Sequence, residues 1–209
     1  MIGAYWYSPV GFEENVVSGG LHVRVVQLNS VCGVGSTGRL VLDIQRGLEN
    51  EGHEGYVFYG RGPTSPCDNH IYIGRRLHTY VHVALTRLLD RHGFGSRRAT
   101  IGLVRQIGSL NPNIIHLHNI HGYYVNIDVL FDYLRRAGKP IVWTLHDCWA
   151  FTGHCSYFDY INCDKWKTGC FACPQKKEYP ASILIDNSRD NYHLKKRLFS
   201  GLDRMTIVT

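Results

Sequence analysis

Hydrophobic and polar residues follow two alternating patterns along the chain from residue 21 onward. Short runs rich in valine, isoleucine and leucine have the character of buried parallel strands, and longer stretches between them repeat apolar residues at helical spacing. The expected strands are Leu21–Asn29, Tyr56–Tyr59, Ile71–Ile73, Asn113–His118, Ile141–Leu145 and Arg204–Thr209. The expected helices are Leu40–Leu48, Tyr80–Leu89, Ile127–Leu134 and Ser182–Phe199. This alternation predicts an α/β fold, a Rossmann-like parallel sheet with helices on both faces.

Other parts of the chain carry neither pattern. Residues 1–20 show no sustained period and end in a Ser-Gly-Gly turn, so we expect an irregular N-terminal extension. The pattern assigns no element between Leu89 and Asn113. Residues 148–180 contain aromatic, cysteine and turn residues without a regular period. We expect them to form an irregular Cys-rich insert in a single domain that spans residues 21–209.

The composition favours one compact domain. Of the 209 residues, 44% are hydrophobic and 19% are charged, which supplies a core and excludes a disordered chain. No apolar run reaches the roughly 18–20 residues of a membrane span, and the first residues lack a basic secretion signal. The seven cysteines are an odd number, which fits a reducing compartment better than a disulfide framework. We therefore expect a cytoplasmic protein.

The charge permits a phosphate-bearing partner without requiring one. Lysine and arginine total 23 against 17 acidic residues, a net charge of +6. The basic residues cluster only at Arg97–Arg98 and Lys195–Arg197, and clusters of this size are more often ordinary solvated surface. We expect no nucleic-acid partner.

A glycine-rich loop follows the first expected strand. Gly33, Gly35 and Gly38 match G-x-G-x-x-G, a pattern that brings backbone N–H groups close to an anion when it lies between a strand and a helix. Ser36 and Arg39 belong to the same predicted phosphate-binding set. The alternative is a tight turn without a ligand. The absence of G-K-[ST] in this loop excludes a P-loop.

Three histidines come to the carboxyl edge of the expected sheet, where ligands of open parallel sheets bind. His116 and His118 are two residues apart on one strand, so they share a face, with His118 nearer the edge, and His121 follows in the loop. We predict that His118 contacts the substrate, with His116 a weaker candidate. Alternatively, these rings are satisfied by backbone hydrogen bonds. A metal trio is not expected, because no carboxylate lies nearby in the sequence.

The next strand ends in a second polar pair at the same edge. His146 and Asp147 are sequence neighbours, so they cannot pair tightly with each other, but both could address one ligand. His146 would donate or accept a hydrogen bond, and Asp147 would accept one from a sugar hydroxyl or orient a ring nitrogen. The competing hypothesis is that Asp147 only caps the following segment.

Four cysteines lie close together inside the insert. Cys155, Cys163, Cys170 and Cys173 have the spacing C-x7-C-x6-C-x2-C, and four thiolates on one Zn²⁺ would hold a loop that has little regular structure. Only the final pair has a spacing typical of zinc knuckles. A structural zinc, free thiols and disulfides all remain open. Cys148 and His154 are substitute ligands.

Three segments together resemble a known family. LNSVCGVGSTGR after the first strand, NPNIIHLHNIHGYYVN, and GKPIVWTLHDCWAFTGHCSYF are similar to bacterial glycosyltransferases of family 4, in particular those of polysaccharide and colanic-acid-type assembly. The similarity covers about residues 22–209. It implies the N-terminal half of a GT-B fold, the half that grips the acceptor, without the C-terminal domain that holds most of the nucleotide-sugar donor.

The resemblance also implies a reaction. Such enzymes move a sugar from a nucleotide-sugar donor, here a UDP- or GDP-sugar, to a glycan or lipid-linked acceptor with retention of configuration and without a protein nucleophile or required cofactor. It places Gly33 and Gly35 against the donor phosphates and makes His118, His146 and Asp147 the catalytic set. His116, His121 and Tyr123 would bind the acceptor. Peripheral contact with the inner membrane surface is also expected, and this chain alone is expected to be inactive.

Two other classes compete with this interpretation. G-x-G-x-x-G is also the dinucleotide fingerprint, but the second strand ends in Tyr59-Gly60-Arg61-Gly62 rather than in the acidic residue that NAD requires. Arg61 would still allow an NADP-dependent oxidoreductase, and Tyr192 with Lys196 spells YxxxK, which we attribute to chance. The second alternative is a non-catalytic module that binds a carbohydrate or nucleotide.

Overall fold

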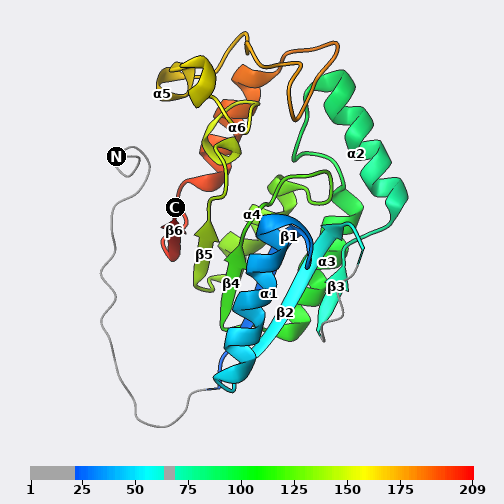
Figure 1. Ribbon diagram of the computed structural model, residues 1–209, viewed down its shortest axis with the longest axis vertical. Helices are drawn as coiled ribbons and strands as arrows, with labels where there is room; N and C mark the ends of the chain where they lie inside the picture. The colour runs from blue at the N-terminus through cyan, green and yellow to red at the C-terminus, as the bar shows by residue number, and fades with distance from the viewer. Residues whose placement is uncertain (1–21, 64–68) are drawn as a thin grey trace.

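The computed structural model describes residues 22–63 and 69–209, so the expected extension at residues 1–20 lies outside the described residues. Six strands form one sheet in the order β3-β2-β1-β4-β5-β6, and every neighbouring pair is parallel (Figure 1). The strands are β1 Arg24–Val31, β2 Glu54–Arg61, β3 His70–Tyr72, β4 Ile114–Leu117, β5 Ile141–Thr144 and β6 Met205–Val208. This is the strand order of a Rossmann fold, so the predicted fold class is confirmed.

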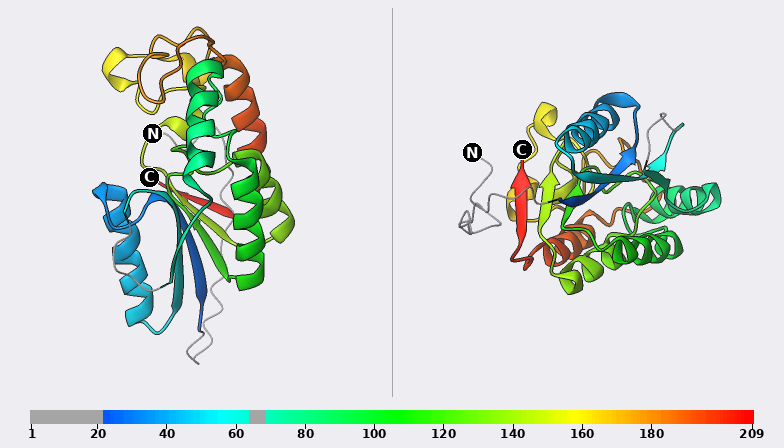
Figure 2. Two further views of the ribbon diagram at one scale, coloured as in Figure 1. Left: turned by 90° about the vertical axis from the view of Figure 1, so that its right-hand side faces the viewer. Right: turned by 90° about the horizontal axis from the view of Figure 1, so that it is seen from below.

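Helices cover both faces of the sheet, as the alternating pattern predicts. Helix α1 (Gly35–Asn50) lies on one face, and the opposite face carries α3 (Arg97–Leu110), α4 (Ile127–Ala137) and α6 (Ser188–Phe199) (Figure 2). Helix α2 (Arg76–Leu89) extends past the carboxyl edge of the sheet. Asn126 caps α4 by accepting the N–H of Val129, and Gly138 ends this helix in a left-handed conformation.

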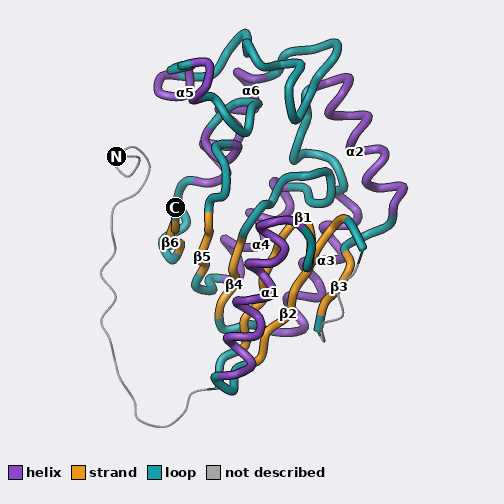
Figure 3. Tube along the Cα trace, viewed as in Figure 1, coloured by secondary structure: helices purple, strands orange, loops and turns teal. Residues whose placement is uncertain are grey.

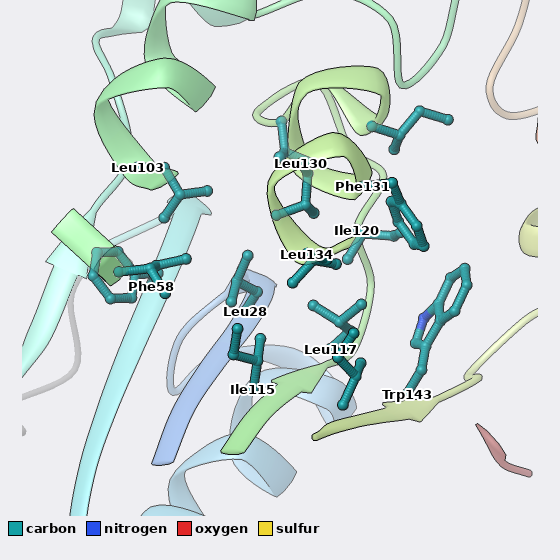
Figure 4. Close-up of a cluster of buried hydrophobic side chains, with 14 of the residues drawn as sticks. Leu28, Phe58, Leu103, Ile115, Leu117, Ile120, Leu130, Phe131, Leu134 and Trp143 are labelled. Atoms are coloured by element: carbon teal, nitrogen blue, oxygen red, sulfur yellow. The ribbon is translucent and has the colours of Figure 1, made fainter. Parts of the chain in front are cut away.

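The main core lies between the sheet and the three-helix layer. Figure 4 shows Leu28, Ile115 and Leu117 of the strands packed against Leu130 and Phe131 of α4, and all five are fully buried. Burying one such side chain contributes about 1.5–3 kcal/mol. Because side chains alternate along a strand, the residues between these apolar positions face the α1 side, where the polar site is built.

Helix α3 is the element that the sequence pattern does not predict. Its buried residues Ala99, Leu103 and Ile107 are four positions apart and form a narrow apolar stripe against the core. Gly102 and Gly108 lie inside the helix and have low helical propensity, so the sequence pattern that predicts a helix is weak here. Helix formation here depends on tertiary packing more than on local preference. Helix α6 also begins six residues later than expected, at Ser188.

The segment between β5 and α6 has little regular structure (Figure 3). It contains two 3-10 turns and one short helix, η1 Trp149–Phe151, η2 Asp159–Ile161 and α5 Lys165–Thr168. The rings of Phe158 and Trp166 stack with centroids 5.3 Å apart, and Phe151 meets the edge of the stack. Lys165 Nζ donates to two backbone carbonyls of the same segment. Side chains rather than a backbone ladder hold this region together.

In the part of the chain that the structure describes, no helix is both long enough and apolar enough to cross a membrane.

Candidate active site at the carboxyl edge of the sheet

The loops that follow β1, β4 and β5 meet at one edge of the sheet. The N–H of His118 donates to Leu28 O, which continues the pairing of β4 with β1 by one residue beyond the end of β4. Asn29 joins the loops beyond this point, because its Oδ1 accepts from Asn119 N at 3.2 Å and its Nδ2 donates to Thr37 Oγ1 at 3.4 Å. The glycine loop and the histidine-bearing loop are therefore direct neighbours.

The glycine loop turns directly into the first turn of α1. Gly33 and Gly35 have φ values of 72° and 66°, a left-handed conformation that residues with a Cβ rarely adopt. The helix starts at Gly35, and its N-cap residue Val34 makes no side-chain capping bond. The first N–H groups of the helix, with the exposed Ser36, are thus open to a ligand from outside the helix.

Gly38 has a different task from the other two glycines. A Cβ at this position would lie 3.1 Å from Gly33 N and 3.2 Å from Val31 Cγ2, so only glycine lets the helix approach the end of β1 so closely. The N–H of Gly33 donates to Gly38 O and closes the loop. Arg39 is exposed, and its Nε donates to Gly35 O. The structure therefore assigns Gly38 to packing.

A chain of polar side chains runs from beneath α1 to the sheet edge. The Nε2 atom of Gln27 donates to the carbonyl of Val41 in α1 at 3.1 Å. Its Oε1 lies 3.3 Å from Nε2 of His118, and Nδ1 of His118 lies 3.1 Å from Nε2 of His146. The side chains of His118 and Gln27 are buried, and His146 is half-buried at the outer end.

The amide of Gln27 sets the tautomers of both rings. Its Oε1 can only accept, so the proton of His118 is on Nε2, and Nδ1 of His118 accepts from the Nε2–H of His146. His146 then carries an unprotonated Nδ1. This atom has no hydrogen-bond partner in residues 22–63 and 69–209 and is not sealed from solvent. We call this hydrogen-bonded chain of Gln27, His118 and His146 the relay. It presents one oriented acceptor atom, Nδ1 of His146, at the sheet edge.

Both rings of the relay are neutral at neutral pH. Burial lowers the pKa of His118 to about 3, and the charges that His116 and His146 would carry add to this effect. Burial also lowers the pKa of His146, although the carboxylate of Asp147 opposes the shift. A neutral imidazole can accept a proton or a hydrogen bond, which an imidazolium cannot.

His116 lies behind His118 on the same face of β4, as the two-residue spacing predicts. The ring centroids are 4.0 Å apart. Nε2 of His116 bonds to Thr144 Oγ1 at 2.9 Å, and burial lowers the pKa of His116 to about 4. His116 is one layer farther from the edge than His146.

Asp147 pairs with His121 from the neighbouring loop, a partner that the sequence does not reveal. Its Oδ2 lies 2.8 Å from Nε2 of His121, and its Oδ1 accepts from the N–H of Trp149 at 2.9 Å. Asp147 thus caps the segment that follows it and also orients the ring of His121, and its contact with a ligand stays a prediction. Burial is the largest single influence and raises the pKa of Asp147, but the hydrogen bond and charge of His121, the N–H of Trp149 and the charge of Lys195 together outweigh it, and the net shift is downward.

Tyrosines complete the wall of the site around His121. The hydroxyl of Tyr179 lies 3.4 Å from Nδ1 of His121, and burial raises the pKa of Tyr179, so the hydroxyl keeps its proton and donates to the ring. Tyr123 has a φ of 70° after Gly122 and is packed edge-on against His92. A non-glycine residue in this conformation is uncommon and marks a closely constrained loop.

Comparison with known proteins gives the site its family. Residues 37–172, more than half of the chain, match the model of Glycosyltransferase Family 4. The chain belongs to glycosyltransferase family 4. It is also 30% identical over 189 residues to the protein of Escherichia coli (strain K12) named "Putative colanic acid biosynthesis glycosyl transferase WcaC". This alignment covers 85% of the chain and 45% of that relative, so the chain spans less than half of the relative's length.

Membership in glycosyltransferase family 4 decides against the oxidoreductase interpretation. Tyr192 and Lys196 are in α6, where the hydroxyl of Tyr192 donates to Trp166 O, away from the glycine loop. The YxxxK spelling is therefore a coincidence of a helical segment.

Two residues at this site are not among the site residues predicted for a glycosyltransferase, and the sequence marks Arg61 only as a residue that would allow NADP. Gln27 is a buried polar residue between the apolar residues Val26 and Leu28 of β1, which is the signal that could have marked it. Arg61 ends β2 at the same edge as the glycine loop, since it pairs in register with Val31 of β1. Position alone could have ranked Arg61 with the other edge residues.

The four cysteines of the insert line one cavity, apart from the sheet-edge site. Cys155, Cys163, Cys170 and Cys173 share its wall with Phe158 and Trp166 among other residues. These thiols are free, and in the described ranges no three or more His, Cys, Asp or Glu side chains are placed to hold a metal ion. A hydrogen bond with Cys173 lowers the pKa of Cys155 to about 7. Zinc binding therefore stays a prediction.

Neither substitute zinc ligand faces this cavity as a free group. Nδ1 of His154 is 2.5 Å from Oδ1 of Asp90, and both side chains are sealed from solvent. Cys148 is a half-buried thiol whose pKa is raised to about 12 by burial.

Proposed function

We propose that this chain is the acceptor-side half of a retaining glycosyltransferase that transfers a sugar from a UDP- or GDP-sugar to a glycan or lipid-linked acceptor in surface polysaccharide biosynthesis. The observation that carries the proposal is the oriented, unprotonated Nδ1 of His146 at the same carboxyl edge of the sheet as the glycine loop. The family match and the similarity to WcaC support the general reaction class. A second, donor-binding domain completes the site in this proposal.

His146 receives the acceptor hydroxyl. Its Nδ1 accepts the hydroxyl hydrogen bond, and His118 holds the ring in the correct tautomer through the relay from Gln27. The pair of Asp147 and His121 fixes the wall beside it at a 2.8 Å contact. His116 and Tyr123 line the same side and limit the orientations of the acceptor. Such positioning contributes to rate by holding reactants in near-attack geometry.

The donor diphosphate binds against the glycine loop. The N–H groups near Gly33, Gly35 and Ser36 and the positive end of α1 stabilise the charge that develops on the leaving diphosphate. Among the edge residues, no serine–histidine–aspartate triad and no spaced carboxylate pair offers a protein nucleophile. The leaving diphosphate therefore takes the acceptor proton, and the sugar keeps its anomeric configuration. No cofactor is needed for this step.

The outer surface of α2 contacts the cytoplasmic face of the inner membrane in this proposal. Ile183 N–H donates to Arg87 O at 2.6 Å, so residues 183–185 continue the surface of the helix. The exposed apolar side chains of this surface include Leu77, Tyr80, Val81, Ile183 and Leu184. Arg75 and Arg76 lie at the start of the helix and suit anionic headgroups.

Vesicle sedimentation tests this contact. The chain should bind vesicles that contain phosphatidylglycerol, and the double variant Leu77→Asp/Leu184→Asp should lose binding. Leu40→Asp is the matched control, because Leu40 is an exposed leucine on α1. Equal binding by the double variant and the control would reject the membrane proposal.

We also propose that the four cysteines of the insert close around one structural zinc. Their spacing and their common cavity support this, although the thiols must move closer to reach a tetrahedral set. Metal analysis of protein purified with zinc should give about one zinc per chain. Cys170→Ser should abolish it, and Cys32→Ala should not. A wild-type chain without zinc would contradict the proposal.

Ligand-dependent thermal shifts test the proposed function itself. UDP- or GDP-sugars should raise the unfolding midpoint of the chain, because the glycine loop alone holds part of the diphosphate. NADPH should have a smaller effect. Stabilisation by NADPH alone would reject sugar transfer and revive the oxidoreductase alternative. Stabilisation by a free acceptor glycan without any nucleotide effect would favour a carbohydrate-binding module.

A further inference from the structure

Arg61 reaches across the carboxyl edge from β2 toward the histidine-bearing loop. It ends β2 opposite Val31, where the glycine loop begins. A Cβ on Gly122 would stand 3.3 Å from Nη2 of Arg61 and 3.3 Å from Ser30 Cβ, so the guanidinium lies over the end of β1. Its central carbon is 5.9 Å from the ring centroid of Tyr123. Gly122 provides the space for this side chain.

The guanidinium is not neutralised by the residues around it. Within residues 22–63 and 69–209, Arg61 has no ion pair, and its Nε is buried without a hydrogen-bond partner. Arg24 shows the usual arrangement, since its Nε bonds to Glu54 at 2.6 Å. The nearby carboxylate of Asp147 already binds His121 and Trp149 N. A buried donor left unsatisfied destabilises the folded chain, and an anion that accepts from it removes this penalty.

The position of Arg61 defines the chemistry of the missing partner. A guanidinium presents a planar fork of donors that matches the oxygens of phosphate or carboxylate. The open N–H groups at the start of α1 border the same edge and also favour an anion. The two groups come from different elements, β2 and the β1–α1 loop, and they can hold adjacent oxygens of one phosphate or diphosphate.

We propose that Arg61 binds a phosphate group of a substrate, together with the N–H groups of the glycine loop. The inference rests on the proposed function, and it deepens that function by naming a protein side chain for the anion. The phosphate belongs either to the nucleotide diphosphate of the donor or to the diphosphate of a lipid-linked acceptor. Both sources share the chemistry that Arg61 recognises.

Calorimetric titration of the chain with four probes tests this inference. The probes are inorganic pyrophosphate, UDP, GDP and farnesyl diphosphate. Arg61→Gln should weaken pyrophosphate binding at least tenfold, and Arg61→Lys should fall between it and the unsubstituted chain, because lysine keeps the charge but loses the fork. Arg46→Gln is the matched control, since Arg46 is an exposed arginine on α1 that pairs only with Asp43.

The nucleotide and prenyl probes separate the two sources. Among the three diphosphate esters, weaker binding of UDP and GDP alone assigns Arg61 to the donor, and weaker binding of farnesyl diphosphate alone assigns it to the acceptor. A thermal melt of each variant checks folding, and if Arg61→Gln fails to fold, the lysine variant decides. Unchanged binding of every probe in folded variants, or no binding by the unsubstituted chain, overturns the inference.

The result is distinguishable from failure of the proposed function. Sugar transfer that proceeds unchanged in Arg61→Gln contradicts this inference alone. Arg61-dependent pyrophosphate binding in a protein that transfers no sugar contradicts the proposed function alone.

Discussion

Two histidine–aspartate pairs in this molecule show how position decides what the same chemistry does. The sealed pair, His154 with Asp90, has side chains that are 0% and 1% exposed. The edge pair, His121 with Asp147, has side chains that are 8% and 10% exposed and lies at the carboxyl ends of β4 and β5. The first is sealed inside the protein, and the second lies at the sheet edge that also carries the glycine loop.

The partners of each pair explain the difference. Asp90 ends α2, accepts the N–H of Asn187 at 2.9 Å, and receives Asn191 on its backbone carbonyl. The sealed pair therefore ties α2, the insert and α6 together. Asp147 instead fixes a loop beside His146, whose Nδ1 stays open. A histidine–aspartate pair is thus a site candidate only where its surroundings include a free functional atom.

The largest effect on stability should come from the sealed pair. Asp90→Ala leaves His154 and the backbone N–H of Asn187 without their partner in the interior, so the free energy of unfolding should fall by about 3–5 kcal/mol. Chemical denaturation measures this change. Asp132→Ala, which removes an exposed pair with Arg136, should cost less than about 1 kcal/mol. Equal effects of the two variants would show that the sealed pair contributes no more to stability than an exposed pair does.

Acid should lower the free energy of unfolding, because the protein contains buried histidines that are neutral at pH 7. Burial lowers the pKa of His82 to about 4 and that of His118 to about 3, from 6.5. The unfolded chain binds these protons first, so stability is complete above pH 6.5 and falls as the pH drops toward 4. The loss is at most on the order of 3 kcal/mol for His82.

Thermal unfolding between pH 7 and pH 4 tests this. His82→Gln should flatten the decline, although it lowers stability at pH 7, because His82 Nε2 accepts the N–H groups of Gly93 and Gly95. A midpoint that does not change over this range would contradict the assignment of neutral rings.

The edge pair should matter more for turnover than for folding. Asp147→Asn keeps an acceptor for Trp149 N but removes the charge that holds His121. The free energy of unfolding should therefore fall by only about 1–2 kcal/mol. Sugar transfer by a protein that carries this chain should fall more than tenfold, because the wall of the acceptor site shifts. If the variant lost several kcal/mol in its free energy of unfolding and kept full activity, Asp147 would have a structural role, as Asp90 does.

The smallest effect should come from the buried end of the relay. Gln27→Leu leaves the backbone intact but removes the acceptor that sets the tautomer of His118. Turnover should fall by about tenfold with KM little changed, and the pH profile should shift, which loss of packing alone would not cause. Gln27→Glu keeps an acceptor and should recover part of the activity. An unchanged pH profile in the leucine variant would reject the relay.

The central part of the sheet could be predicted from the sequence because β1, β2, β4 and β5 contain no exposed residue and include apolar runs. The carboxyl-edge positions of Gly33, His118 and His146 follow from the ends of these runs. The pairing of His121 with Asp147 could not be predicted, because it depends on the left-handed conformation of Tyr123 and the path of two loops. The same holds for the insert, where aromatic contacts replace periodic structure.

Turnover of His146→Gln is the most direct measurement of the central claim, that an oriented imidazole at the sheet edge receives the acceptor. Sugar transfer by a protein that carries this chain should fall by about 10²-fold, with UDP or GDP binding and the unfolding midpoint unchanged. His193→Gln, an exposed histidine on α6, is the control and should keep full activity. Equal activity of the two variants would contradict the account.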